Sequence, residues 1–450
     1  MSPAPIGTGA QLRALLRLAA PIAAAQAGFA AMGLVDTAVV GRLGAAPLGA
    51  VGLANGLFFA VAVVGLGAMM GLDPLFAQAL GAGDRARARQ LVWQGAWLAL
   101  AASAVLSVPL ALLPLVLVPA GIDPWTAREA AHCLWLRIPG VLPMLLFAGL
   151  RSYLQAEGRV AALVVAMLAA NVANFALDVI LVFGWGPVPA MGAPGSALAT
   201  SICSALQFAI LLLDVRSGGG PRAPRGADLA KALRIGLPVG LQMAAEVGVF
   251  ALVGVLVGRL GAAPLAAHQV ALSLASFTFC FAVGVGNAGS VVVAWSIGAR
   301  DTPAARRGGL LAFAVGAAFM GACALAFWLM PGRIAELFGG DPAIVAASIP
   351  LLYVAAVFQI SDGIQAVGAG ALRAAGDTRF AFVANVAGHY AVGLPVALLL
   401  GFRLRGGVVG LWWGLCAGLT AVAVLLFARF WRLSSRPIEP LERLAETSRS

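Results

Sequence analysis

VGRLGAAPL occupies residues 40–48, and the same nine letters return at residues 257–265, 217 positions later. The tetrapeptides GAGD at residues 81–84 and GARD at residues 298–301 are related by the same offset. A chain rich in Ala and Gly produces short accidental matches, but not a series of them in one register across more than forty residues. The chain therefore consists of two halves that repeat each other.

The composition indicates a membrane protein. Of the 450 residues, 61% are hydrophobic and only 10% are charged, whereas a soluble protein carries about 25% charged residues. Apolar runs of 20 or more residues recur along the whole chain, and each is long enough to cross a bilayer. We predict twelve spans, near residues 15–41, 49–80, 91–118, 128–155, 160–184, 192–214, 231–258, 265–298, 309–330, 344–372, 380–402 and 408–432.

The net charge of +11 is carried mainly by arginines in the short loops between spans. Basic residues concentrate in or beside the even-numbered loops, for example Arg85, Arg87 and Arg89 in the second loop. Because loops rich in Arg and Lys stay on the cytoplasmic side, both termini are predicted to be cytoplasmic. We therefore expect a monomeric multi-pass protein of the prokaryotic cytoplasmic (inner) membrane. We expect the protein to have the lipid bilayer as a partner. The loop arginines are accounted for by membrane topology, so we expect no nucleic-acid partner.

The predicted fold class is an all-α polytopic membrane protein with twelve transmembrane helices in two six-helix lobes. Each half has an even number of spans, so the lobes are expected to form a parallel pseudo-two-fold repeat about an axis along the membrane normal. We assign residues 1–213 to the N-terminal lobe and 231–433 to the C-terminal lobe. Residues 214–230, rich in Gly, Pro and Arg, form a cytoplasmic linker, and residues 434–450 form a cytoplasmic tail.

Four carboxylates lie inside apolar spans. Asp36 lies within residues 21–40, and Asp178, Glu246 and Asp362 occupy similar settings. A charged side chain near the middle of a bilayer costs roughly 2.5–3.5 kcal/mol on insertion scales. Carboxylates retained at that cost most often bind cations or protons.

In the N-terminal half, the carboxylates have polar neighbours at matching depth. Asn171, Asn174 and Asp178 follow i, i+3, i+7 spacing and lie on one helix face. Counted from the predicted span ends, Asp36, Asp178 and Thr200 lie in one layer. Together with Asn174, they supply the oxygen ligands that a hard cation such as Na⁺ takes. The same group is compatible with a proton shared between the two carboxylates, or with a polar cluster that only joins helices.

In the C-terminal half, Gln242 and Glu246 are one turn apart on the seventh span. Gln359, Asp362 and Gln365 line one face of the tenth span. An acidic pocket at this depth suits a cationic amphiphile. The alternative is an internal pair whose hydrogen bonds are satisfied within the protein.

Other polar residues in the spans are less informative. His132, His268 and His389 are isolated, and we expect structural hydrogen bonds rather than a proton relay. Arg137 lies in the fourth span, where pairing with a carboxylate and extension toward the interface are both open. The five cysteines are dispersed and lack metal-ligand spacing.

Several segments resemble transporters of the multidrug and toxic compound extrusion (MATE) family. They are GLVDT at residues 33–37, LPV at residues 237–239 followed by Glu246, AAHQVAL at residues 266–272, and QISD at residues 359–362. The resemblance covers all twelve spans. It implies drug–cation antiport, with Asp36 as the coupling carboxylate of the N-terminal lobe and Glu246 and Asp362 as acidic residues of the C-terminal lobe.

The subfamily features are mixed. The C-terminal half resembles NorM-like members, whereas Asn171, Asn174 and Asp178 resemble the fifth span of DinF-like members. The coupling ion, Na⁺ or H⁺, and the coupling lobe stay open. In this interpretation Na⁺ binds at Asp36, Asn174, Asp178 and Thr200, and Gln242 and Gln359 join the C-terminal acidic pocket.

We therefore expect a secondary active multidrug efflux transporter that exports small organic cations of amphiphilic character in exchange for inward H⁺ or Na⁺ by alternating access. The alternative is a flippase of related architecture for lipid-linked substrates. A membrane enzyme would need a nucleophile with a base or a cluster of metal ligands, and the sequence suggests neither. It also lacks a GxxxxGK[ST] loop for ATP. Apart from the coupling ion, we expect no cofactor.

Overall fold

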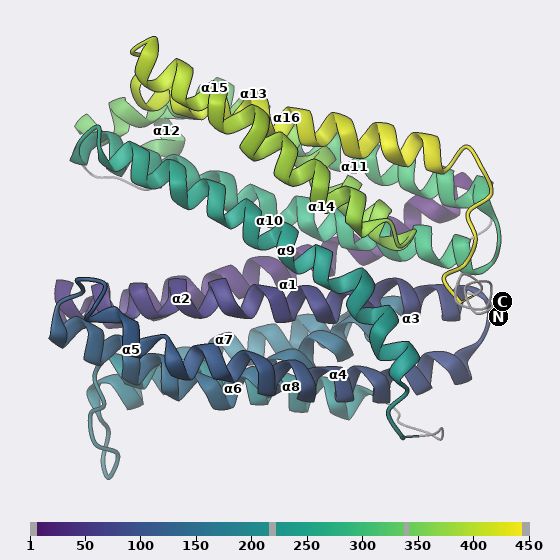
Figure 1. Ribbon diagram of the computed structural model, residues 1–450, viewed down its shortest axis with the longest axis horizontal. Helices are drawn as coiled ribbons and strands as arrows, with labels where there is room; N and C mark the ends of the chain where they lie inside the picture. Colours follow the sequence, from purple (N-terminus) through teal and green to yellow (C-terminus); the bar gives the residue numbers. More distant parts are fainter. Residues whose placement is uncertain (1–6, 216–221, 337–341, 443–450) are drawn as a thin grey trace. The chain divides into compact units, whose positions relative to one another are not determined.

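The computed structural model describes residues 7–215, 222–336 and 342–442, and within these ranges the chain is almost entirely helical (Figure 1). The elements are α1 (Thr8–Gly41), α2 (Ala45–Met70), α3 (Leu72–Gly81), α4 (Arg85–Leu112), α5 (Pro114–Leu117), α6 (Pro124–Ala156), α7 (Ala161–Phe183), α8 (Ala193–Asp214), α9 (Gly226–Gly258), α10 (Ala262–Gly298), α11 (Thr302–Leu329), α12 (Pro331–Glu336), α13 (Pro342–Ala374), α14 (Thr378–Val386), η1 (Ala387–Gly393), α15 (Leu394–Leu398), η2 (Leu399–Arg403) and α16 (Gly407–Leu433).

In the described ranges, twelve helical segments are long and apolar enough to cross a membrane. This confirms the predicted all-α class with six spans in each half. Several helices begin earlier than predicted: α1 at Thr8, α9 at Gly226 and α11 at Thr302. Their first two turns carry charged residues, namely Arg13, Asp228 and Arg306, so the hydropathy pattern marks only the part that matches the bilayer core. The backbone helix continues past that part.

The sequence repeat is also a repeat of local structure. Gly44 and Gly261 precede the second span of each half, with φ angles of 110° and 119° that glycine adopts readily. Asp84 and Asp301 begin the next span, and each carboxylate accepts a hydrogen bond of 2.8 Å from the backbone N–H three residues later. Both pairs are separated by the offset of 217 found in the sequence.

The eleventh span departs from this regularity. It contains two π-helical segments, η1 and η2, on either side of α15. The corresponding span of the N-terminal half, α7, is an uninterrupted α-helix. Short π-helical turns are uncommon and frequently occur at functional sites.

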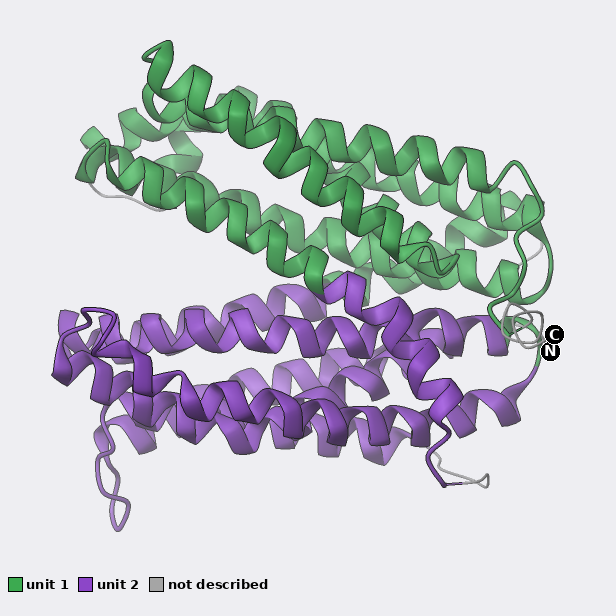
Figure 2. Cartoon of the chain, in the orientation of Figure 1, with its two compact units in different colours: residues 1–23, 80–83, 241–450 green, residues 24–79, 84–240 purple. Residues whose placement is uncertain are grey.

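The chain divides into two compact units (Figure 2). One contains residues 1–23, 80–83 and 241–450, and the other contains residues 24–79 and 84–240. The expected division, 1–213 and 231–433, differs at both crossover helices. The start of α1 belongs with the C-terminal half, and α9 belongs with the N-terminal half as far as Gly240.

The two boundaries follow prolines inside helices. Pro21 and Pro238 are interior residues of α1 and α9, and the units change two residues after each of them. A proline removes one hydrogen bond from the helix ladder and crowds the preceding turn. Each crossover helix therefore contributes its two parts to different units close to the proline that interrupts its hydrogen bonding.

Close helix packing fixes the first part of α9 within its unit. A Cβ atom built on Gly67 of α2 would lie 2.1 Å from the Cα atom of Gly240. No side chain larger than hydrogen fits at that distance. The equivalent residue one repeat later, Gly284, approaches Ala23 of α1 in the other unit, where a Cβ atom would lie 2.6 Å from the Ala23 Cβ. Both crossover helices thus pack against a glycine at the same repeat position.

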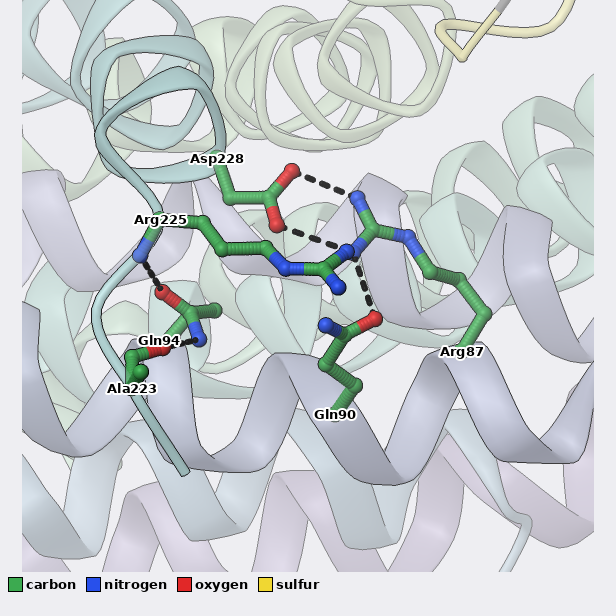
Figure 3. A network of polar contacts seen from close by, with 6 residues as sticks. All are labelled: Arg87, Gln90, Gln94, Ala223, Arg225 and Asp228. Atoms are coloured by element: carbon green, nitrogen blue, oxygen red, sulfur yellow. Dashed lines mark hydrogen bonds and ion pairs between the residues drawn. The ribbon is translucent and has the colours of Figure 1, made fainter. Parts of the chain in front are cut away.

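A polar network fastens the start of α9 to α4 (Figure 3). The Arg87 guanidinium donates hydrogen bonds of 2.8 and 2.5 Å to the two carboxylate oxygens of Asp228 and one of 3.1 Å to the side-chain oxygen of Gln90. These contacts join residues 141 positions apart in the chain.

The segment before α9 is held by the same face of α4. The Gln94 side chain donates a hydrogen bond of 2.9 Å to the carbonyl of Ala223 and accepts one of 2.7 Å from the backbone N–H of Arg225 (Figure 3). The indole N–H of Trp97 donates to the carbonyl of Arg222. The second part of the expected linker is therefore attached to the helix surface, whereas residues 216–221 lie outside the described ranges.

Candidate functional site

The structure brings together the four residues expected to form the N-terminal cluster. Asp36 comes from α1, Asn174 and Asp178 come from α7, and Thr200 comes from α8. The Asn174 amide donates a hydrogen bond of 2.9 Å to Asp36 Oδ1, and the Thr200 hydroxyl lies 3.2 Å from Asp36 Oδ2. Asp36 thus accepts one hydrogen bond at each carboxylate oxygen, both within one unit.

Asp178 has a different environment from Asp36. Its side chain is fully buried, as is that of Asn174, and its carboxyl group lies next to that of Asp36. The Asp178 carboxyl group interacts with the side chains of Asp36 and Ser196, and in the described ranges the side-chain oxygen of Asn174 has no hydrogen-bond partner. Two carboxyl groups buried side by side repel each other when both are ionised.

Asn171 lies on the same face of α7 but has a separate role. Its amide donates to the carbonyl of Gly28 on α1 at 3.0 Å and to that of Met167 at 2.9 Å. These bonds join two helices through backbone groups. Of the polar face predicted on this span, only the part that includes Asn174 and Asp178 reaches Asp36.

In the C-terminal half, Glu246 of α9 is the centre of a second cluster. Its Oε2 atom accepts hydrogen bonds of 3.0 Å from Gln365 of α13 and 3.4 Å from Asn385 of α14. Asp362 is also buried, and its carboxylate interacts electrostatically with Glu246. Both donors to Glu246 are neutral amides, so they orient its carboxylate without cancelling its charge.

Sequence reasoning missed Asn385. It is the only amide in the eleventh span, between Thr378 and Arg403, and it is fully buried. A lone amide inside an apolar span is a usable signal, because it requires a polar partner on another helix.

The other two residues expected in this pocket differ in their surroundings. Gln359 is fully buried and pairs with Thr278 of α10, its amide donating at 2.9 Å. Its placement in the acidic pocket is therefore not supported, because its polar atoms are engaged with another helix. Gln242 is buried on α9, one turn before Glu246.

Arg137 makes a contact that the sequence left open. Its guanidinium donates a hydrogen bond to the side-chain oxygen of Asn55 on α2. It also lies over the ring of Phe58, 4.1 Å from the ring centre. Its partners are an amide and an aromatic face; among the residues described, no ion pair joins it to a carboxylate.

The buried histidines differ from each other. His268 accepts a hydrogen bond of 3.0 Å at Nδ1 from the indole of Trp412, as expected for a structural residue. The ring of His389 lies in η1 near Phe250, and neither of its nitrogens has a hydrogen-bond partner among the described residues. The expected hydrogen bond of His389 is therefore absent from this part of the chain.

In the described ranges, twelve candidate spans with buried carboxylates inside each half form an architecture typical of secondary transporters. The chain belongs to the MatE family, whose model matches residues 21–180 and 238–399, one segment in each half. This match confirms the resemblance to MATE transporters that the sequence segments indicated.

Curated relatives carry the NorM name. The chain is 36% identical over 442 residues to a probable multidrug resistance protein NorM of Deinococcus radiodurans, covering 95% of this chain and 97% of that protein. It is also 36% identical over 429 residues to a multidrug resistance protein NorM of Burkholderia vietnamiensis, covering 92% of each.

Solved structures share the fold. An outward-facing multidrug resistance MATE family transporter of the MOP superfamily aligns with a TM-score of 0.87 at 18% identity. The eukaryotic MATE transporter AtDTX14 aligns with a TM-score of 0.83 at 24% identity. Both alignments cover 94% of this chain and 96% of the other.

Proposed function

We propose that this protein is a secondary active multidrug efflux transporter that exports cationic amphiphilic compounds in exchange for inward H⁺ or Na⁺ by alternating access. The observation that carries the proposal is that two buried carboxyl groups, those of Asp36 and Asp178, lie next to each other. The multidrug resistance names of the NorM relatives support the same activity.

The N-terminal cluster is proposed as the coupling site. Two ionised carboxylates in contact repel each other strongly where water is excluded. A proton shared between Asp36 and Asp178 removes that repulsion and supplies a hydrogen bond between the two carboxyl groups. A sodium ion does the same by taking carboxylate, amide and hydroxyl oxygens as ligands. Either ion stabilises one charge state of the cluster, and a change in that charge state is what couples an ion gradient to transport.

The C-terminal cluster is proposed to select cationic substrates. Glu246 and Asp362 interact with each other, and the donors to Glu246 are neutral. An organic cation that approaches these carboxylates gains an electrostatic interaction that a neutral compound lacks. Its strength is increased by the low dielectric constant of the surroundings.

Transport into proteoliposomes tests the proposal. Uptake of a fluorescent organic cation is measured with an imposed sodium gradient, with an imposed pH gradient, and without a gradient. We expect accumulation against the concentration gradient of the dye with at least one ion gradient. The proposal fails if the folded protein catalyses no gradient-driven movement. Gradient-independent movement of a lipid-linked substrate would instead favour a flippase.

We also propose that the protein lies in the prokaryotic cytoplasmic membrane with both termini in the cytoplasm.

A further inference from the structure

Arg137 lies deep inside a span. It belongs to α6, Pro124–Ala156, and is three residues from the middle of that helix. At 1.5 Å per residue, this is about 5 Å along the helix axis. The hydrocarbon core of a bilayer is roughly 30 Å thick. If the helix is centred in it, the guanidinium is too deep to reach the headgroup region, so extension toward the interface does not account for it.

The contacts of Arg137 occupy only part of its hydrogen-bonding capacity. A guanidinium has five N–H donors. One terminal nitrogen donates to Asn55, and the flat face is covered by Phe58. The Nε and second terminal nitrogen have no hydrogen-bond partner among the described residues, yet they are not among the buried unsatisfied atoms. These two nitrogen atoms of Arg137 are therefore at least partly accessible.

The direct contacts of Arg137 do not neutralise its charge. Asn55 and Phe58 fix the orientation of the guanidinium, but neither carries a charge that compensates it. Asp36 acts on Arg137 electrostatically, and no ion pair joins the two. A purely structural role in joining α6 to α2 would need only a neutral amide or hydroxyl, without the cost of a charge at mid-span.

The geometry of a guanidinium defines the ligand. Two parallel N–H groups match the two oxygens of a carboxylate, and such bidentate contacts are stronger than neutral hydrogen bonds. A phosphate offers similar oxygens, but the phosphate of a membrane lipid lies at the bilayer surface, far from the middle of α6. A carboxylate on an amphiphilic compound that enters the lobe has no such restriction.

We propose that Arg137 is a specificity-determining residue that binds the carboxylate group of amphiphilic substrates, with Asn55 and Phe58 holding the guanidinium in position. The inference rests on the proposed function, because it assumes that organic amphiphiles enter the protein. For compounds that carry a carboxylate together with a positive charge, it assigns recognition of the carboxylate to Arg137.

A matched pair of dyes isolates this contact. Rhodamine B carries a cationic ring system and a free carboxylate, whereas its ethyl ester carries the same ring system without the negative charge. Binding of both dyes to purified protein is measured by fluorescence polarisation. In Arg137→Gln we expect binding of rhodamine B to weaken about tenfold or more, which corresponds to loss of a charge-assisted hydrogen bond. Binding of the ester should stay within about twofold.

Two further variants keep the test independent of folding. Arg137→Lys retains the charge but loses the fork, so its preference for rhodamine B over the ester should lie between those of wild type and Arg137→Gln. Arg128→Gln removes an exposed arginine from the start of the same helix and should leave binding of both dyes unchanged. The melting temperature of each variant confirms that it is folded.

The outcomes separate the two proposals. If wild type transports the ester but Arg137→Gln binds both dyes as wild type does, or loses both equally, the Arg137 assignment is wrong and the transport function stands. If wild type moves neither dye under any gradient, both proposals fail. Repeating the binding measurement with added phosphatidylglycerol tests the lipid source. Competition by this lipid against rhodamine B in wild type, absent in Arg137→Gln, would assign the site to lipid phosphate and overturn the proposal.

Discussion

Arg87 and Asp228 form a two-point ion pair, with 2.8 Å between Nη1 and Oδ2 and 2.5 Å between Nη2 and Oδ1 (Figure 3). The pair connects α4 to the first turn of α9 within one unit. Both side chains are largely buried, so the contact is less screened than a surface ion pair. Since the first part of α9 belongs to the unit of the N-terminal half, this pair helps to hold the crossover helix there.

We predict that Asp228→Asn destabilises the protein by about 2 kcal/mol, because the Arg87 guanidinium keeps its burial but loses its charged partner. The measurement is the melting temperature of the detergent-solubilised protein. Arg85→Gln removes an exposed arginine two residues away on α4 and should have little effect. The exchanged pair, Arg87→Asp with Asp228→Arg, should recover part of the loss. No recovery, with an equal loss in Arg85→Gln, would mean that general surface charge and not this contact matters.

The N-terminal cluster was predictable from the sequence for a physical reason. Helical periodicity gives the face on which Asn174 and Asp178 lie. Successive spans cross the membrane in opposite directions, so counting residues from the predicted span ends gives the depth of Asp36 and Thr200. Both rules hold at these positions, and the four side chains meet in the structure.

The C-terminal cluster was less predictable, because neither rule states how far a helix is rotated toward each neighbour. Asn385 meets Glu246, whereas Gln359 turns to Thr278 although it shares a helix face with Asp362. The π-helical turn that begins two residues after Asn385 also shifts the register of the residues that follow it. Partners such as Asn55 for Arg137 depend on packing between helices that no local pattern specifies.

The C-terminal carboxylates lead to a prediction about substrate charge. In the double variant Glu246→Gln and Asp362→Asn, binding of cationic dyes should weaken about tenfold or more, since two negative charges in a low-dielectric site are removed. Binding of neutral dyes of similar size should change less than about threefold. Both are measured by fluorescence titration of purified protein. Thr278→Val disturbs the pair with Gln359 in the same half and serves as the control. Equal weakening for cationic and neutral dyes would indicate a structural role for the acids.

Membrane orientation is predicted from the arginines of the even-numbered loops. A cysteine placed at Gly186, between α7 and α8, should react with an impermeant maleimide in intact cells. One placed at Gly219, outside the described residues, should react only after the cells are opened. The five native cysteines are buried or half-buried, and replacing them first removes the background. The reverse labelling pattern would invert the predicted topology and overturn the depth argument that depends on it.

The coupling role of the N-terminal cluster gives the last prediction. Asp36→Asn should reduce gradient-driven export at least tenfold while the protein stays folded, because the change removes an intramembrane charge and keeps a side chain of nearly the same shape. The amide no longer repels Asp178, so the cluster loses its need for a proton or a sodium ion. Asp178→Asn should be milder, since its amide still offers one oxygen to a cation held by Asp36. Export is measured in proteoliposomes under separate sodium and pH gradients, after insertion has been verified.

Asn171 provides the matched control for this experiment. It lies on the same helix face as Asn174 but donates only to the carbonyls of Gly28 and Met167. Asn171→Ala should therefore lower the melting temperature without changing which ion gradient drives export. Rates for Asp36→Asn equal to those of wild type under both gradients would mean that the cluster only joins α1, α7 and α8. The coupling carboxylates would then be Glu246 and Asp362, where the neutral amides of Gln365 and Asn385 leave a negative charge in the span.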